Sequence, residues 1–299
     1  ADTIEGRAYR EVFRLAQQYR SEILARYPKI MRRVSGYNLD EFVKAQPFNL
    51  SRMIVGSEGT LATIVEAKMR LVPKPKWTAM DVIHFNDDIA ALECAQVILQ
   101  TRPYAMESTD KMVLNLARGN IEQSRKLGFV QGNPDSLLMV EYAGETEAEV
   151  KDQVYQLEEL RKREKIGYAS TQAFKPEEVK AIWGVRKAGL GLLLGIKGDK
   201  KPIAFVEDTA VAPAKLPEFI KRFREVVSRH ETIAGYYGHC SVGCMHIRPL
   251  INLKEESERD KMVSIANAIS DLVLEFNGAM SGEHGEFEHE IGDRVGDGN

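Results

Sequence analysis

The sequence has few cysteines and no long apolar run, and these absences exclude several classes of protein. Its 299 residues include three cysteines, Cys94, Cys240 and Cys244, too few for a disulfide framework. We therefore expect a reducing compartment, the cytoplasm. The longest apolar stretch, residues 188–196, is far shorter than the ~20 residues that a membrane span needs. Residues 1–7 lack the apolar core of a signal peptide, so we expect neither feature.

Charge of one sign is not in excess either. Lys and Arg total 41 against 44 Asp and Glu, which gives a net charge of -3. Binding to nucleic acid as the main partner requires a basic surface for the phosphates, so we expect no nucleic-acid partner. The chain is 43% hydrophobic and 28% charged, as is ordinary for a globular protein. Its length suggests about two domains.

Helical and strand-like patterns indicate where these two domains meet. Apolar residues at helical spacing predict a helix over residues 7–27, which Pro28 ends. Residues 53–72 read as a strand, a glycine loop and a second strand with alternating apolar positions. Pro73 and Pro75 follow, and because proline interrupts regular structure we place the boundary there. The expected domains are residues 1–75 and 76–299.

Beyond this boundary, strands and helices alternate in two blocks. The expected strands are 80–85, 136–143, 203–211, 232–238 and 245–251. The expected helices are 87–100, one that begins at the capping box of Thr146 and Glu149, 216–229 and 255–276. The Gly-x-Gly-x-x-Gly of a dinucleotide-binding Rossmann unit is absent. We therefore expect an α+β fold, in which helices cover one face of a ferredoxin-like antiparallel sheet.

Two histidines flank a turn of small residues in the segment Gly-His-Cys-Ser-Val-Gly-Cys-Met-His, residues 238–246. Such a turn can bring His239 and His246 to one point, as a metal site requires. The alternative is a pair of hydrogen-bonded histidines near a strand end. Cys240 and Cys244 could complete a zinc site, but we expect them to be small buried residues.

A second segment, Gly-Ala-Met-Ser-Gly-Glu-His-Gly at residues 278–285, places a carboxylate beside an imidazole. Its glycines allow the backbone to approach a ligand closely. Glu283 could be a metal ligand and His284 a neighbouring base, since imidazole accepts protons near pH 7. A surface loop with a charge pair is the alternative.

Weaker signals come from a glycine loop and from basic residues. The loop at residues 56–61 could hold a phosphate or ring oxygens with its backbone N–H groups, although it lacks the lysine of a P-loop. It could equally be an ordinary hairpin turn. Arg186 could bind a carboxylate through two parallel hydrogen bonds, or be a solvated helix arginine. Lys197, Lys200 and Lys201 form a basic turn.

Together these segments resemble one family. Residues 52–65, Arg-Met-Ile-Val-Gly-Ser-Glu-Gly-Thr-Leu-Ala-Thr-Ile-Val, are similar to the flavin-contacting segment of FAD-linked oxidases of the vanillyl-alcohol oxidase type, and residues 35–39 fit it too. Residues 239–246 and 281–285 resemble the paired active-site motifs of the D-lactate, glycolate and D-2-hydroxyglutarate dehydrogenase branch. Residues 197–213 and 239–249 are most similar to bacterial D-2-hydroxyglutarate dehydrogenases fused to an iron–sulfur module.

This resemblance implies roles for individual residues. The implied ligands of a divalent metal, expected to be zinc, are His239, His246 and Glu283. His284 is the implied general base, and Arg186 and Lys201 would hold substrate carboxylates. The implied flavin-binding residues are Gly56, Ser57, Glu58, Gly59, Thr60 and Ile64. In the implied reaction a D-2-hydroxy acid, D-2-hydroxyglutarate or a D-lactate-like acid, is oxidised to the 2-keto acid by hydride transfer to FAD.

The resemblance also implies what the two expected domains are. Residues 1–75 would be the second lobe of a PCMH-type FAD-binding domain, and residues 76–299 the substrate-binding cap. The family's pyrophosphate-binding lobe has no counterpart here, residues 286–299 do not match, and three scattered cysteines cannot hold an iron–sulfur cluster. We expect a fragment whose partner polypeptide supplies the missing lobe and module. The alternative is a catalytically silent fragment or subunit that only binds such a partner.

Overall fold

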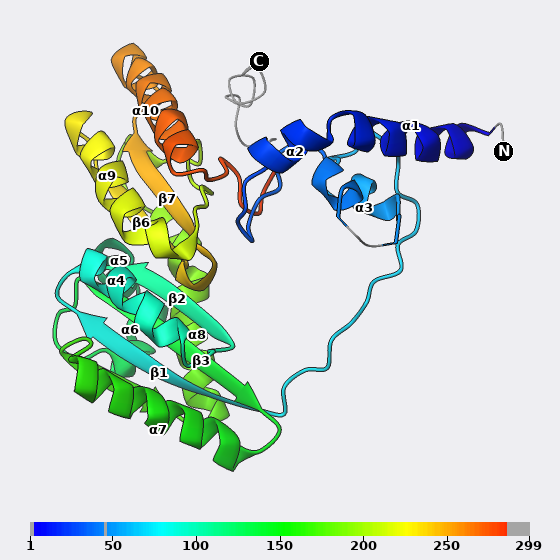
Figure 1. Ribbon diagram of the computed structural model, residues 1–299. Coiled ribbons are helices and arrows are strands. Elements are labelled where there is room, and N and C mark those ends of the chain that lie inside the picture. The colour runs from blue at the N-terminus through cyan, green and yellow to red at the C-terminus, as the bar shows by residue number, and fades with distance from the viewer. Residues whose placement is uncertain (1–2, 45–46, 286–299) are drawn as a thin grey trace.

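The computed structural model describes residues 3–44 and 47–285, so the atypical tail at residues 286–299 lies outside them. A small helical N-terminal part is joined by an extended connection to a larger body (Figure 1). The N-terminal helices are α1 (Ile4–Gln18), α2 (Arg20–Arg26), the 3-10 helix η1 (Leu39–Phe42) and α3 (Ser51–Ile54). The helix expected over residues 7–27 is therefore two helices, which meet at Tyr19. Their apolar faces pack against η1 and α3.

The connection does not form the two strands expected within residues 53–72. Met53 lies in α3, and residues 61–76 run extended without pairing with any strand in the described part of the chain (Figure 1). Apolar side chains there, such as Val65 and Leu71, are exposed. The prediction of two strands here is wrong, because an alternating pattern makes a strand only where a neighbour accepts its backbone hydrogen bonds.

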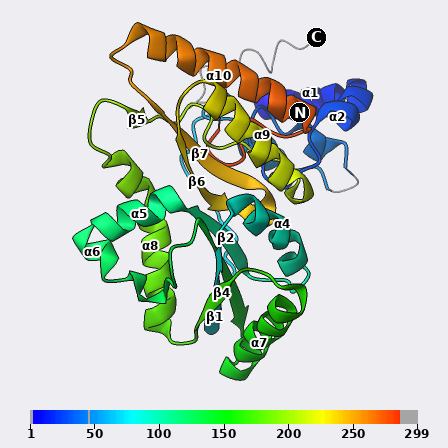
Figure 2. The same cartoon turned by 90° about the vertical axis from the view of Figure 1, so that its left-hand side faces the viewer.

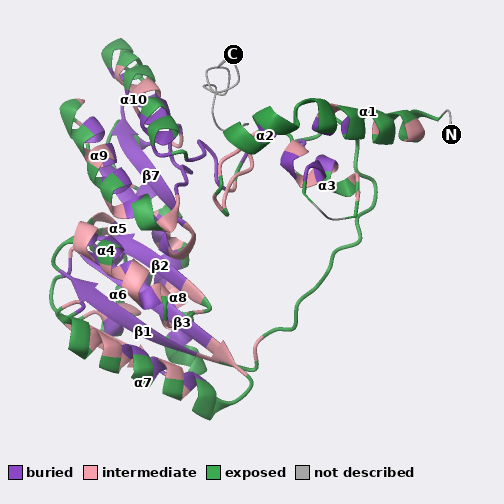
Figure 3. Ribbon diagram, viewed as in Figure 1, coloured by how far each residue is buried: buried purple, intermediate pink, exposed green. Residues whose placement is uncertain are grey.

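One seven-stranded antiparallel sheet forms the centre of the body. Its strands are β1 (Trp77–Phe85), β2 (Ala105–Asp110), β3 (Ser136–Gly144), β4 (Ala169–Ala173), β5 (Lys201–Pro202), β6 (Ala234–His239) and β7 (Cys244–Ile251). Their order across the sheet is β4-β1-β3-β2-β6-β7-β5. The antiparallel sheet and the α+β class are confirmed. Figure 3 shows that the strands are mostly buried, while the helices expose one side.

The helices cover both faces of this sheet, so the expectation of one covered face is wrong. The first face carries α4 (Asp88–Leu99), α7 (Glu147–Glu164), α9 (Leu216–Arg229) and α10 (Glu256–Glu275). The opposite face carries α5 (Lys111–Gly119) and α8 (Pro176–Leu194), with the short α6 (Ile121–Ser124) beside them (Figure 2). The reason is visible in β1, where every residue from Ala79 to Phe85 is buried. A strand buried on both sides requires a layer on each.

Most of the other expected elements of the body are present, but one strand is not. Residues 203–211 form no regular strand, yet they run beside β7 and hydrogen-bond to it at intervals. The Ile247 N–H donates to the Glu207 carbonyl oxygen at 2.8 Å, and the Val211 N–H donates to the Gly243 carbonyl oxygen at 2.9 Å. Ala210 also bridges to Ala279, so this segment lies between β7 and residues 278–285. It therefore connects the two histidine-containing segments.

No helix in the described ranges has the length and apolar character needed to cross a bilayer.

Candidate functional site

The hairpin of β6 and β7 brings the two predicted histidines together. His239 ends β6 and His246 lies in β7, and their Nε2 atoms are 3.4 Å apart. The turn includes the 3-10 helix η4 (Cys240–Val242) and Gly243, whose φ is +76°. A Cβ atom at Gly243 would lie 1.9 Å from the Val211 carbonyl oxygen, so the turn accommodates glycine only.

The two cysteines of the turn do not join the histidines. Cys240 and Cys244 are fully buried, as expected of small core residues. The Cys240 thiol donates to the Met106 carbonyl oxygen at 3.3 Å, and the Cys244 thiol donates to Asp208 Oδ1 at 3.2 Å. Burial raises the pKa of both thiols, which disfavours the thiolate form that metals bind. A His2Cys2 zinc site is therefore not the arrangement that the structure presents.

Asp208 holds the loop that carries the Glu-His pair. Its Oδ2 atom accepts hydrogen bonds from the Ser281 hydroxyl at 2.8 Å, the Glu283 N–H at 2.9 Å and the His284 N–H at 2.7 Å. Burial opposes ionisation of this carboxyl, but the hydrogen bonds from the two N–H groups and the Ser281 hydroxyl, together with the neighbouring His284, lower its pKa. The ionised Asp208 therefore fixes the backbone at positions 283 and 284.

Glu283 completes a set of three donors around one centre. Its Oε2 atom lies 3.2 Å from His239 Nε2, and Arg32 holds the other oxygen at 3.1 Å. The ligand atoms of His239, His246 and Glu283 all lie within 4.8 Å of one another. Ligands about 2.1 Å from a tetrahedral ion are about 3.4 Å apart, so the spacing and donor types fit a zinc-like cation. Their role as ligands stays a prediction.

The two histidines of this set differ in their proton affinity. Hydrogen bonds to Glu107 and then to Glu283 raise the pKa of His239 to about 9. Burial and then the charge of His239 lower the pKa of His246 to about 4. His246 therefore presents a neutral ring at neutral pH, whereas a cation must displace a proton from His239.

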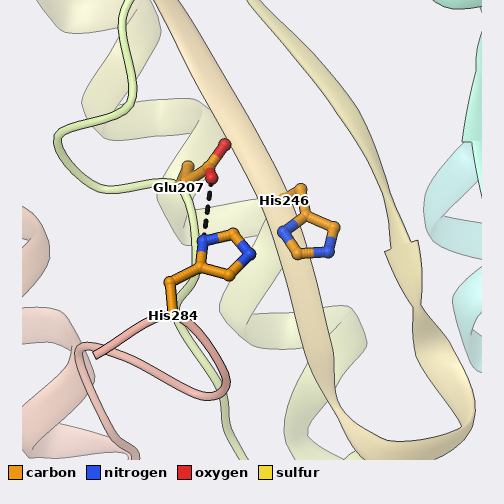
Figure 4. A group of neighbouring side chains, drawn as sticks. All are labelled: Glu207, His246 and His284. Atoms are coloured by element: carbon orange, nitrogen blue, oxygen red, sulfur yellow. Dashed lines mark ion pairs between the residues drawn. The ribbon is translucent and has the colours of Figure 1, made fainter. Parts of the chain in front are cut away.

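His284 lies beside the donor set and faces a second carboxylate (Figure 4). Its Nδ1 atom is 3.0 Å from Glu207 Oε1, and its ring stacks on that of His246 with centroids 5.3 Å apart. Glu207, His246 and His284 could also hold a cation by the spacing of their ligand atoms. Glu207 is held by a buried ion pair with Arg248, whereas the Arg32 side chain that pairs with Glu283 is 43% exposed. An exposed ion pair is weak, so Glu283 can turn to a cation more easily than Glu207. We therefore favour the set that contains Glu283.

The structure gives the two predicted substrate-binding residues different surroundings. Arg186 is buried, with 9% exposure, and donates to Glu107 Oε2 from Nε at 3.0 Å and from a terminal nitrogen at 2.7 Å. It is therefore not a solvated helix arginine. Lys201 is exposed and pairs in register with Ile251, five residues along β7 from His246, a separation of about 16 Å. Their contact with substrate stays a prediction.

The predicted flavin-binding loop lies against the Glu-His loop. Gly56, Glu58 and Gly59 all have positive φ, which gives a tight turn rather than a hairpin between strands. A Cβ atom at Gly285 would lie 2.6 Å from Glu58 Oε1, so the two loops are in contact. Thr60 is anchored through its hydroxyl to the Tyr37 hydroxyl at 2.8 Å.

Flavin binding by Gly56, Ser57, Glu58, Gly59, Thr60 and Ile64 stays a prediction. Ile64 differs from the rest of this group, because it lies in the extended connection with 63% of its surface exposed.

Sequence reasoning missed five charged residues of this site, Arg32, Glu107, Glu207, Asp208 and Arg248. A signal existed for the adjacent acids Glu207 and Asp208, because they interrupt the otherwise apolar run at residues 203–211. Buried acids in a strand-like segment need partners. Glu107 lies in β2, whose polar sequence Ala-Met-Glu-Ser-Thr-Asp shows no apolar alternation. It could not be singled out.

Comparison with known proteins identifies the family of the chain. The family model of FAD linked oxidases, C-terminal domain, matches residues 74–291. D-2-hydroxyglutarate dehydrogenase of Pantoea ananatis is 32% identical over 295 residues, and that of Escherichia coli is 32% identical over 300 residues. These matches cover 95% and 96% of this chain and 29% of each relative. The chain therefore spans less than a third of the length of these relatives.

Solved structures agree on the fold. Alkyldihydroxyacetonephosphate synthase superposes with a TM-score of 0.53 and 14% identity, covering 79% of this chain and 45% of that one. The 4-ethylphenol oxidase of Gulosibacter chungangensis gives a TM-score of 0.51 and 10% identity, with coverages of 72% and 47%. Because the family model matches well over half of the chain, the chain belongs to the FAD linked oxidases and contains their C-terminal domain.

Proposed function

We propose that this chain is the substrate-binding part of an FAD-dependent D-2-hydroxyacid dehydrogenase that acts on D-2-hydroxyglutarate or a D-lactate-like acid. The observation that carries the proposal is the convergence of His239, His246 and Glu283, with His284 beside them. Contact between Glu58 and Gly285 supports the proposal, because the loop proposed to bind flavin then lies against the Glu-His loop. The names of the relatives in Pantoea and Escherichia support this substrate class.

In this proposal the two parts of the chain divide the work. Residues 1–75 contribute to flavin binding, and residues 76–299 bind the substrate. His239, His246 and Glu283 hold a divalent cation, with zinc suited to the two imidazoles and one carboxylate. When bound, the cation would polarise the hydroxyl and carboxylate oxygens of the substrate, and FAD would supply the hydride acceptor.

His284 is the proposed acceptor of the hydroxyl proton. Its Nδ1 atom faces Glu207, so Nε2 is the ring atom that would take the proton. The Asp208 carboxylate holds the His284 backbone, which keeps the ring at a fixed distance from the cation site. The chain itself therefore supplies the base, its orientation and the cation ligands.

A stereoselective turnover assay tests this function. The chain is mixed with FAD, zinc and a polypeptide that corresponds to the part of the relatives that this chain does not cover. Reduction of a dye is then followed with D-2-hydroxyglutarate and, separately, with L-2-hydroxyglutarate. We expect reduction with the D form only. His284→Ala should lower kcat by about 10²- to 10⁴-fold, the usual range for a general base.

His230→Ala is the matched control, because His230 hydrogen-bonds to Ser264 on α10, outside the site. Its activity should equal that of the wild type. Undiminished turnover in His284→Ala would contradict the role of the base. Absence of turnover with both enantiomers would favour the silent subunit instead.

A further inference from the structure

Glu107 is a buried carboxylate at the edge of the proposed cation site. It lies in β2 with 6% exposure. Its Oε1 atom is 2.6 Å from His239 Nδ1, while Oε2 accepts both hydrogen bonds from Arg186. Both of its oxygens are thus engaged. A buried charge is tolerated only when it is paired and hydrogen-bonded in this way.

We propose that Glu107 and Arg186 are positioning residues of the cation site, which act through His239. This inference rests on the proposed function, because it assumes that His239 is a cation ligand. Glu107 accepts a hydrogen bond from Nδ1 of His239, so a neutral His239 ring keeps its hydrogen on Nδ1. The lone pair that can bind a cation is then on Nε2. That atom faces His246 and Glu283.

The geometry explains why the oxygen of Glu107 can hold the ring in one orientation. An imidazole on a metal usually donates its other N–H to a carboxylate, which fixes the ring and increases its basicity. Glu107 comes from β2 and His239 from β6, and these strands pair at Ser108 and Gly238. The carboxylate and the ring are therefore carried by adjacent positions of two bonded strands.

Arg186 reaches this carboxylate from α8 on the opposite face of the sheet from α9 and α10. Its guanidinium also lies over the Tyr237 ring, 4.9 Å from the centroid. Without Arg186, Oε2 of the buried Glu107 would lose both of its hydrogen bonds, and breaking a buried ion pair in this way is destabilising. The proposal therefore gives Arg186 a role in holding Glu107, beside the substrate contact that the resemblance implies.

The test measures zinc affinity of the purified full chain at one pH by competition with a colorimetric zinc chelator. We expect Glu107→Gln to weaken zinc binding by about 10- to 100-fold, the usual effect of removing such a partner. Arg186→Met should weaken it as well. The double variant should be no weaker than Glu107→Gln alone, because Arg186 acts through Glu107.

The matched control is Glu141→Gln, which neutralises another buried glutamate on the neighbouring strand. Glu141 accepts a hydrogen bond from Trp183 on α8 and does not touch the histidines. Its zinc affinity should equal that of the wild type. Arg186→Lys is a second variant, to be used if Glu107→Gln fails to fold. Because lysine keeps the positive charge, Arg186→Lys should keep most of the zinc affinity that Arg186→Met loses.

Turnover kinetics separate the two roles of Arg186. A substrate-binding arginine predicts a raised KM for D-2-hydroxyglutarate at saturating zinc with unchanged zinc affinity, and that result would overturn the inference. Wild-type zinc affinity in both Glu107→Gln and Arg186→Met would overturn it too. If the wild-type chain itself binds no zinc, the cation site of the proposed function fails together with the inference.

Discussion

Asp208 offers a sharp test of how the Glu-His loop is held. The side chain is fully buried, and its Oδ2 atom accepts hydrogen bonds from the Ser281 hydroxyl and from two backbone N–H groups. Asp208→Asn can keep this pattern, with the amide oxygen at the Oδ2 position and the amide nitrogen facing the Cys244 sulfur. Asp208→Ala removes the acceptor altogether. The two variants therefore separate the charge from the hydrogen bonds.

The expected losses follow from the three hydrogen bonds to Oδ2. A bond to a charged acceptor contributes about 1.5–3 kcal/mol and a neutral one about 0.5–1.5 kcal/mol, so neutralisation costs about 1 kcal/mol for each bond. The lower desolvation cost of an amide offsets part of this sum, and we expect about 1–3 kcal/mol for Asp208→Asn. Asp208→Ala leaves three donors without their acceptor, at about 1–3 kcal/mol each, so we expect at least about 3 kcal/mol.

Urea unfolding of the purified chain measures these losses, and zinc competition reports whether the loop stays in place. We expect Asp208→Asn to keep zinc affinity within about 10-fold and Asp208→Ala to lose it. Asp199→Ala is the control, because Asp199 forms an exposed ion pair with Lys254 and should cost under about 1 kcal/mol. An unfolding midpoint of Asp208→Ala equal to that of the wild type would refute this account of the loop.

Three further predictions concern the turn, a buried acid and the core. Gly243→Ala should abolish zinc binding and lower the urea midpoint, because its Cβ atom would meet the Val211 carbonyl oxygen at 1.9 Å. Burial raises the pKa of the Asp81 carboxyl from 3.8 to about 6. Between pH 3.8 and about 6 the folded chain therefore holds a proton that the unfolded chain has released, and the free energy of unfolding falls as pH rises through this range. Asp81→Asn should therefore add about 3 kcal/mol at pH 7 and nothing below pH 4, and equal gains at both would contradict this sign. Phe219→Ala should cost about 3–5 kcal/mol in urea unfolding because its ring is fully buried, and a loss below 1 kcal/mol would argue against this packing.

Local patterns were sufficient for most of the body of the fold. The amphipathic stretch at residues 216–229 is α9, and the Thr146 capping box begins α7 with the hydroxyl accepting from the Glu149 N–H. These elements depend on periodicity and on a cap, which are properties of neighbouring residues. The strands expected at 136–143 and 245–251 are also present as β3 and β7.

What could not be predicted depended on contacts between distant parts of the chain. β2 carries Glu107 and lies at the centre of the sheet, but its polar composition resembles a loop. Its acid is paired by Arg186, 79 positions away. Conversely, the alternating pattern near Val65 favoured a strand that has no neighbour within the described residues. Sequence periodicity shows which side chains prefer burial, but not what lies against them.

The site is built from carboxylates that each join an arginine to a histidine. The pairs are Glu107 with Arg186, Glu207 with Arg248, and Glu283 with Arg32. In each pair one carboxylate oxygen meets the guanidinium and the other faces His239 or His284. The arginine offsets the charge that burial penalises, and the remaining oxygen can then orient a ring. Because the three arginines come from α8, β7 and the N-terminal part, the imidazole orientations depend on the docking of all three elements. Displacing the N-terminal part, which contributes no strand to the sheet, should therefore disturb the cation site before it unfolds the sheet.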